Sequence, residues 1–310
     1  MAITAADIKN LRDKTGVGMM ECKKALTETN GDVEKAIVYL RERGIAAAAK
    51  KASRIAAEGM VLPFYCDKCG VAVLIEVNSE TDFAAKNEKF SGFVKDLATI
   101  IAKNDPADVD ALMKLNYLDS ELTVEQELNN KILTIGENIK IRRFQRFAAD
   151  AGCIYSVYNH ASAGKVGVVV KLAVSENLLG NEEVASFAHD ICMGVAANRP
   201  EFICSDDIPE ERLASEREIL KNQVINEGKP AAVADKIVAG RMGKIFEEIC
   251  LIDQPYIRDM KISVKAQMAN LTKQFGGEIK VVAYTRYECG EGLEKRVENF
   301  AEEVAKQMKQ

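Results

Sequence analysis

The chain has 310 residues, an apolar fraction of 47% and a formal net charge of −5, with a pI near 5.4. This length allows two or three domains, and the acidic balance argues against a general nucleic-acid-binding protein. No run approaches the roughly 18 uninterrupted apolar residues of a membrane-spanning helix, and the N-terminus lacks a signal-peptide or transit-peptide pattern. We therefore expect a cytoplasmic protein that does not bind membranes.

The first part of the chain has three short runs with helical apolar periodicity, over residues 4–14, 19–29 and 32–44. Thr4 and Asp32 are suited to cap the first and third helices, and we expect Gly44 to end the third. A three-helix bundle of this size resembles ubiquitin-associated modules. Residues 45–57 are rich in alanine and lysine, and we interpret them as an exposed helical linker that completes an N-terminal domain over 1–57.

A weak internal repeat occupies the middle of the chain. Phe93 matches Phe187 and Pro106 matches Pro200, both at an offset of 94 residues. Each copy has the pattern of two strands followed by a helix, which predicts an α+β fold with two related antiparallel sheets covered by helices. The predicted core halves span 58–148 and 149–289, and we expect a long helical stretch over 119–147 between the two copies.

Two charge-rich helices with a narrow apolar seam interrupt the second half at about 206–247. Leu213, Leu220 and Val224 recur near heptad spacing, which fits a protruding antiparallel coiled-coil hairpin, and a helix pair packed on the surface is the alternative. The sequence leaves open whether this hairpin forms a homodimer, projects freely or contacts another partner. Residues 290–310 predict a C-terminal helical module.

The segment that joins a strand over 71–77 to the following helix is polar except for one aromatic residue. Asn78, Ser79, Thr81 and Asp82 supply the groups that cap a helix, whereas Phe83 has no capping role. Taken alone, Phe83 is more readily interpreted as a core residue, because aromatic side chains are more often buried than displayed. The alternative is a wedge presented to a partner.

Residues that could carry chemistry are sparse. Cys66 and Cys69 have metal-ligand spacing, but there is no second such pair, and His160 and His189 lie far away in the sequence. We interpret the cysteine pair as a hairpin turn, with a metal site as the alternative. Residues 159–166 approximate a phosphate-binding loop without its first glycine and its hydroxyl residue. No nucleophile and base converge. We therefore expect a binding protein without cofactor or metal, and not an enzyme.

Several longer motifs occur in the order in which the elongation factor Ts family has them. They are TGVGMMECKKAL (15–26), EVNSETDF (76–83), IGENI (135–139), YNH (158–160), GKP (228–230), GRM (240–242) and RYECGEG (286–292). These motifs extend over essentially the whole chain. The sequence therefore resembles that family of guanine-nucleotide exchange factors for elongation factor Tu.

The resemblance implies a partner, elongation factor Tu, in its GDP-bound and nucleotide-free forms. The corner would insert near the Mg²⁺ site of that GTPase and help to displace the ion, and its residues here are Thr81, Asp82, Phe83 and Ala84. Other partner-binding positions implied by the resemblance are Met19, Met20, Lys23, Ile135 and His160. The C-terminal helix would also dock on the GTPase.

The sequence departs from the family pattern at Ala84, where the family often has valine, and at Ser79, where it often has cysteine. The turn over 66–69 is also unusual for the family. There are three alternatives to an exchange factor. A ubiquitin-type adaptor follows from the N-terminal bundle, and a nucleic-acid binder follows from the basic run over 50–54. An enzyme is the third alternative.

Overall fold

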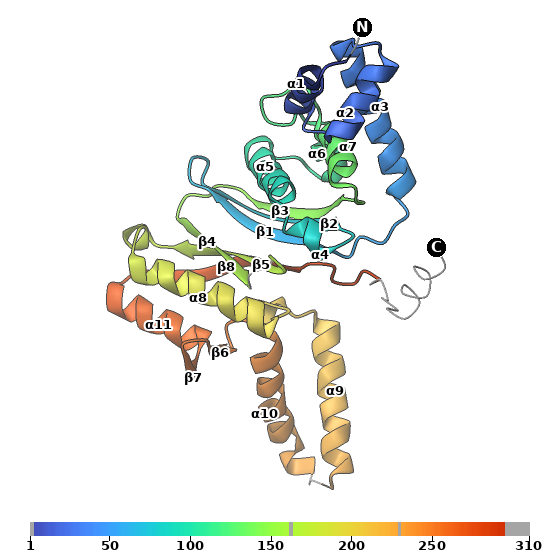
Figure 1. Cartoon of the computed structure of the whole chain (residues 1–310). Helices are drawn as coiled ribbons and strands as arrows, with labels where there is room; N and C mark the ends of the chain where they lie inside the picture. The colour runs from blue at the N-terminus through green and yellow to red at the C-terminus, as the bar shows by residue number, and fades with distance from the viewer. Residues whose placement is uncertain (1–2, 161–163, 229–230, 295–310) are drawn as a thin grey trace.

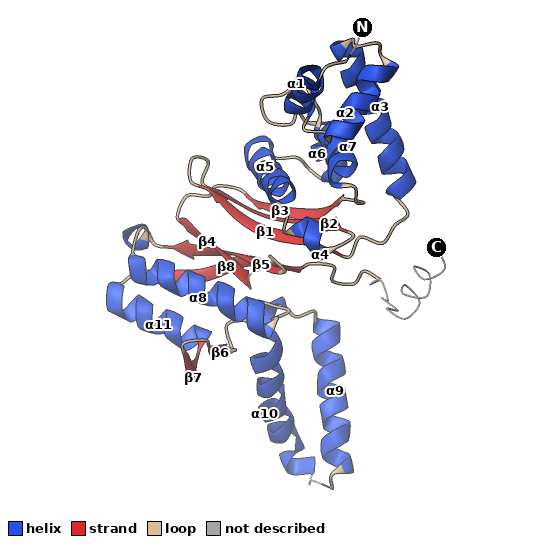
Figure 2. Cartoon of the chain, in the orientation of Figure 1, coloured by secondary structure: helices blue, strands red, loops and turns tan. Residues whose placement is uncertain are grey.

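The computed structural model describes residues 3–160, 164–228 and 231–294. Within these ranges the chain has a mixed α/β fold, in which two three-stranded antiparallel sheets lie face to face between layers of helices (Figure 1). The helical layers lie on the outer sides of the two sheets (Figure 2). The expected α+β class with two related antiparallel sheets is confirmed.

Three helices at the N-terminus, α1 (Ala5–Thr15), α2 (Met19–Glu28) and α3 (Val33–Lys51), pack around one apolar cluster. Thr4 caps α1 through a reciprocal pair of bonds with Asp7, and the Asp32 side chain accepts from the third amide of α3. Gly16 adopts the left-handed conformation that ends α1. The three helices begin where the sequence predicted them, and Thr4 and Asp32 cap the first and third as expected.

The predicted end of the third helix is wrong. α3 continues through Gly44 to Lys51, because Gly44 lies against helix α7 (Val124–Ile135). A Cβ added at Gly44 would lie 3.3 Å from the carbonyl oxygen of Asn129, so glycine serves a close helix crossing there. Lys51 Nζ also donates to the Ile132 carbonyl at 3.3 Å. The expected linker is therefore mostly the second half of α3, which fixes the N-terminal helices to the core.

The first sheet contains β1 (Glu58–Cys66), β2 (Val71–Ser79) and β3 (Lys140–Phe147), in that order. Helix α5 (Glu88–Asn104) covers its outer face and buries Phe90 and Phe93 there. The short helices α4 (Asp82–Ala85) and α6 (Val109–Lys114) flank α5 in the sequence. The Cys66–Cys69 segment forms the β1–β2 hairpin turn, as predicted.

Strand β3 contradicts the helical stretch expected over 119–147. Helix α7 ends at Gly136, whose backbone is left-handed. The apolar residues Ile141 and Phe144 lie three apart, which is a helical spacing, yet both pack on the same face of the sheet. The register between β2 and β3 shifts at Glu76, so that one extra residue of β3 separates them. This β-bulge interrupts the alternation of inward and outward side chains in β3. The apolar pattern therefore did not predict a strand.

The second sheet contains β4 (Cys153–His160), β5 (Val166–Val174) and β8 (Ile279–Glu288). Its outer face packs on α8 (Glu182–Asn198) and α11 (Val264–Phe275), and a small ribbon of β6 (Pro255–Tyr256) and β7 (Asp259–Ser263) lies beside them. Two 3₁₀ turns span Glu176–Leu178 and Ser205–Asp207.

The internal repeat extends to details of the backbone. Asp105 and Arg199 end α5 and α8 in the same left-handed conformation, with φ of 50° and ψ of 53° at each. Both central strands also carry a register shift, at Glu76 in β2 and at Lys171 in β5. The repeat therefore includes a third strand in each half, β3 and β8, which the predicted pattern of two strands and a helix left out.

Each half also contains the same side-chain clasp on its covering helix. In the first half the Tyr117 hydroxyl donates to Asp96 at 2.6 Å. In the second half the Tyr256 hydroxyl donates to Asp190 at 2.5 Å. Each tyrosine ring also lies 5.9 Å from the phenylalanine three residues before its aspartate. The two aspartates match at the repeat offset, but the tyrosines come from connections of very different length.

The inner faces of the two sheets meet at an apolar interface formed by Val61, Leu74, Val169 and their neighbours. Gly167 lies at the closest approach, because an added Cβ would be 2.6 Å from Val61 and 2.8 Å from Leu74. The sheets therefore approach closely only because β5 carries no side chain at this position.

The hydrogen bonds of one buried carboxylate connect the first sheet to the end of the second sheet. Glu76 of β2 is fully buried, and it bonds Arg142 at 2.9 Å, Arg143 at 2.7 Å and the Gly290 amide after β8 at 2.8 Å. Burial opposes the charged form, but these donors and Asn78 outweigh it, so the pKa of Glu76 lies below its ordinary value of 4.5. Arg143 also lies 4.1 Å above the ring centre of Tyr287 in β8.

Helices α9 (Glu210–Asn226) and α10 (Ala231–Ile249) form a hairpin that extends away from the two sheets (Figure 1). Leu220, Val224, Val238 and Met242 line its seam. Pro209 is the N-terminal cap of α9. Most of the expected C-terminal module, residues 295–310, lies outside the described residues. No described helix has the length and apolar character to cross a bilayer.

We predict that Glu76→Gln lowers the free energy of unfolding by about 2–4 kcal/mol at neutral pH, because it leaves the two arginines without their shared anion. Denaturant unfolding measures the change. Glu42→Gln, on the exposed side of α3, is the matched control and should change stability by less than about 0.5 kcal/mol.

The Glu76→Gln deficit should also depend on pH. Because the folded-state pKa of Glu76 is lowered, its contribution is present above 4.5 and is lost as pH falls through the folded value. The wild-type and Glu76→Gln proteins should therefore converge in stability below pH 4.5. A deficit that stays constant through this range would show that the charge of Glu76 contributes nothing.

Candidate functional site

The corner between β2 and α4 is a tightly capped turn. Thr81 has extended backbone, and its Oγ1 accepts from the Ala84 amide at 3.2 Å. The Ser79 hydroxyl donates to the Thr81 carbonyl at 2.9 Å. Ala84 is buried beneath this turn. The polar residues thus satisfy the backbone groups of the corner, as the sequence predicted.

A second segment holds the corner from outside. Glu137, just after α7, accepts from the Thr81 amide at 3.0 Å and from its hydroxyl at 2.6 Å. In the opposite direction, Glu80 accepts from the Asn138 amide at 2.6 Å and pairs with Arg54 at 3.3 Å. We call the Thr81–Glu137 and Glu80–Asn138 bonds the corner clamp. Bonds to ionised carboxylates are the stronger class, so the clamp restricts the corner.

Sequence reasoning did not assign a role to Glu137. The residue lies 56 positions from Thr81, and no local pattern connects them. The one available signal was its place in the IGENI motif, next to the predicted contact residue Ile135. In the structure Ile135 is partly buried at the end of α7, two residues from the clamp.

Phe83 is displayed, not buried. Its side chain is 80% exposed, so the interpretation of Phe83 as a core residue is wrong. Lys86 Nζ lies 5.8 Å from the ring centre and 2.8 Å from the Asp82 carboxylate. The Lys86 hydrogen bond lowers the pKa of Asp82, and Lys165 adds to the effect. The corner therefore presents an aromatic ring beside an ionised carboxylate.

The methionines predicted to bind a partner are also exposed. Met20 is 77% exposed and Met19 is 43% exposed at the start of α2, and Lys23 follows on the same helix. Lys89, near the start of α5, donates to the Gly16 carbonyl at 3.3 Å. This bond connects the loop before α2 to the helix that follows the corner.

A groove of about 760 Å³ connects the corner to the second sheet. Ala85 and Lys86 line it from the corner, and Asn159 lines it from the end of β4. Next to Asn159, His160 is exposed, and its Nδ1 lies 2.9 Å from the Tyr158 hydroxyl. The fold thus places the strand that ends at His160 across a groove from the corner. Residues 161–163 of the loop that resembles a phosphate-binding loop lie outside the described residues.

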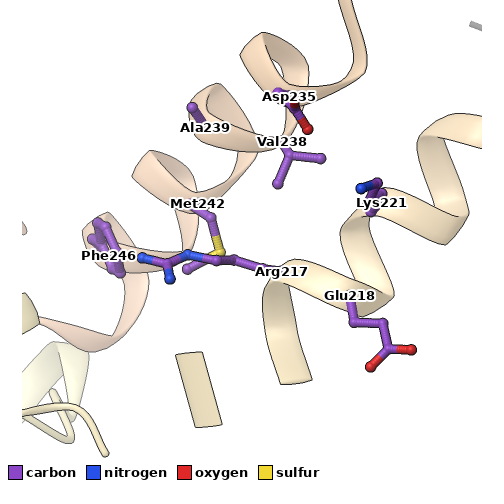
Figure 3. A pocket seen from close by; sticks show the side chains of 8 residues that line it. All are labelled: Arg217, Glu218, Lys221, Asp235, Val238, Ala239, Met242 and Phe246. Atoms are coloured by element: carbon purple, nitrogen blue, oxygen red, sulfur yellow. The ribbon is translucent and has the colours of Figure 1, made fainter. Parts of the chain in front are cut away.

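The helical hairpin carries a second groove, of about 550 Å³. Figure 3 shows the Arg217 side chain extending from α9 toward Met242 and Phe246 of α10. Glu218, Lys221 and Asp235 add charges along the same groove. This surface lies on the hairpin and away from the corner (Figure 1).

Two of the basic residues that suggested nucleic-acid binding are engaged within the chain. Lys51 bonds the Ile132 carbonyl, and Arg54 pairs with Glu80 of the corner clamp. Within the described ranges, no group of three histidine, cysteine or acidic side chains is placed to hold a metal ion.

Comparison with known proteins identifies one family. The family model described as elongation factor TS matches residues 80–291. Elongation factor Ts of Clostridium perfringens (strain SM101 / Type A) is 44% identical over 98% of each chain. The proteins of the same name from Clostridium novyi (strain NT) and Syntrophotalea carbinolica are 45% and 43% identical, over 99% and 100% of each chain.

We predict that two neighbouring substitutions differ in their effect on stability. Phe83→Ala should change the free energy of unfolding by less than about 0.5 kcal/mol, because the ring is exposed. Thr81→Val should cost about 1–2 kcal/mol, because it removes the cap hydroxyl and one bond of the corner clamp. Denaturant unfolding distinguishes them. A loss of several kcal/mol in Phe83→Ala would place the ring in the core.

Proposed function

Because the chain belongs to the elongation factor Ts family, we propose that it binds elongation factor Tu bound to GDP and promotes GDP release, after which GTP binds. The observation that carries the proposal is the exposed Phe83 ring on a corner held by the clamp. A rigid turn keeps an apolar side chain available to a partner at little cost in conformational entropy on binding.

The proposed mechanism requires no covalent chemistry, so we propose that the protein is not an enzyme. GDP is held in a GTPase by backbone amides and by Mg²⁺, which neutralises the diphosphate charge. A protein that binds the nucleotide-free form more tightly must weaken nucleotide binding by the same factor. In this proposal Thr81, Asp82 and Phe83 enter near the Mg²⁺ site, with Ala84 packed beneath them, and favour loss of the ion.

One aromatic side chain is not enough for a large acceleration. Burying Phe83 contributes roughly 1.5–3 kcal/mol, which corresponds to about one to two decades in an equilibrium constant. The interface must therefore extend over other surfaces. We propose that these surfaces include Met19, Met20, Lys23, Ile135 and His160, and their arrangement around the corner supports this extent.

Finer features of the organisation stay proposals. They comprise domain boundaries near 57, 148 and 289, the likeness of the N-terminal helices to ubiquitin-associated modules, and coiled-coil packing of the hairpin. A homodimer through α9 and α10 is a further proposal, which sedimentation of the purified chain tests. Cytoplasmic location and the lack of nucleic-acid or membrane binding belong to the same set.

We predict that substoichiometric amounts of this protein accelerate release of a fluorescent GDP analogue from elongation factor Tu with turnover. Phe83→Ala should slow this release by up to about 10- to 100-fold, because the burial of one ring is lost. The double variant Asp82→Ala with Phe83→Ala should be slower still. Partner binding by Phe83→Ala should stay detectable in a pull-down, since the other surfaces remain.

Met260→Ala is the matched control for this assay. Met260 is 67% exposed on β7 and lies outside the proposed interface. Its loss should leave nucleotide release unchanged. No acceleration by a folded wild-type sample would contradict the proposed function, and equal rates for Phe83→Ala and wild type would contradict the role of the corner alone.

A further inference from the structure

The turn between β1 and β2 places two cysteine sulfurs in contact. Cys66 ends β1 and Cys69 lies in the turn, and their Sγ atoms are 2.8 Å apart. The Cys69 amide donates to the Cys66 carbonyl at 3.1 Å, and the Gly70 amide donates to the same carbonyl at 2.8 Å. The backbone of the turn, and not a flexible side-chain contact alone, brings the two thiols together.

This pair differs from the other cysteines of the chain. All eight cysteines lie within the described ranges, and Cys66 and Cys69 are joined by a direct sulfur–sulfur hydrogen bond. Cys22, Cys192 and Cys250 are buried, whereas Cys66 and Cys69 are half-buried at the edge of the first core. A small reagent in solvent therefore has access to the pair.

The surroundings give the two sulfurs different roles. Either sulfur can donate the hydrogen bond between them, and with the proton on Cys69 this bond lowers the pKa of Cys66, with the Cys69 and Lys68 amides adding to the effect. The same bond raises the pKa of Cys69. Because the thiolate is the reactive form and the Cys69 and Lys68 amides favour it at Cys66, we assign Cys66 as the attacking sulfur and Cys69 as the second one to react.

The separation favours a disulfide over a metal site. Two cysteine sulfurs on one tetrahedral zinc, with bonds of about 2.3 Å, lie roughly 3.8 Å apart. The two free thiols lie 2.8 Å apart, which is closer than two ligands of one zinc ion. The ends of a β-turn lie within about 7 Å, which suits the Cα separation of a disulfide. The described residues also supply no third ligand.

We propose that Cys66 and Cys69 form a dithiol site that reacts with small-molecule disulfides by thiol–disulfide exchange. The Cys66 thiolate attacks one sulfur of the reagent, forms a mixed disulfide and releases one thiol. Cys69 then loses its proton and attacks the Cys66 sulfur, which releases the second thiol and closes a Cys66–Cys69 disulfide. The protein dithiol is oxidised and the reagent disulfide is reduced to two thiols.

The sequence provides a direct assay. Trypsin cleaves after Arg54, Lys68 and Lys86, so the two cysteines fall on separate peptides, 55–68 and 69–86. The reduced full-length chain is incubated with glutathione disulfide near neutral pH, acidified, alkylated, digested and analysed by mass spectrometry. We expect the two peptides to appear joined and unalkylated, with a mass two hydrogen atoms below the sum of the two reduced peptides. Treatment with dithiothreitol should separate them.

Three outcomes would overturn the proposal. Alkylation of both cysteines would show that the pair does not react. A lasting glutathione adduct on the wild-type pair, or a link from either residue to another cysteine, would show that the turn does not close. A zinc ion that copurifies at one per chain and blocks oxidation would establish the metal site instead.

Single variants test the assigned order of attack. Cys69→Ser should stop at a glutathione adduct on Cys66, because the second thiol is missing. Cys66→Ser should form an adduct on Cys69 more slowly. Cys153→Ser, which removes another half-buried thiol, should close the 66–69 disulfide as the wild type does. Equal adduct rates on the two remaining thiols would contradict Cys66 as the attacking sulfur.

Discussion

The arrangement of this molecule depends on one buried carboxylate. Glu76 lies in the central strand of the first sheet, and its oxygens are shared between two arginines of β3 and the backbone that leaves β8 of the second sheet. Apolar packing between the two sheets has no strong orientational preference of its own. The directed bonds of Glu76 supply that preference, since a shift of one sheet over the other would leave a buried charge without its donors.

The corner follows from the same strand. Glu76 and Thr81 lie at opposite ends of a six-residue stretch, so fixing β2 also fixes where the turn to α4 begins. The corner clamp then holds the turn against the segment between α7 and β3. An exposed ring on a mobile loop would lose conformational entropy when it is buried in a partner. Because of the corner clamp, the corner loses this conformational entropy during folding, before any partner is present.

Local signals in the sequence predicted the elements that local chemistry decides. The caps at Thr4, Asp32 and Thr81, the hairpin turn at Cys66 and the two repeated halves are where the residues indicated. Features decided by a distant neighbour were not predicted.

Four examples show why local signals did not predict these features. Gly44 can end a helix or allow a close crossing, and only the position of α7 distinguishes the two. The apolar spacing of β3 looks helical until its bulge against β2 is known. Taken alone, Phe83 is typical of a core residue, and the family resemblance rather than a local signal indicated that it is presented to a partner; in the fold it is exposed. The role of Glu137 depends on a pairing that spans 56 residues, which no local pattern indicates.

The hairpin of α9 and α10 is inserted between the two members of one clasp, Asp190 and Tyr256. In the first half the equivalent connection, from α5 to Tyr117, contains only the short helix α6. At the base of the hairpin the chain returns to its starting point, because Phe202 and Cys250 form a β-bridge and the Glu201 amide donates to Ile249. The core therefore contacts the hairpin mainly through the place where the chain leaves and returns. The hairpin can therefore be lengthened, shortened or replaced during evolution without a change in the structure of the repeated core.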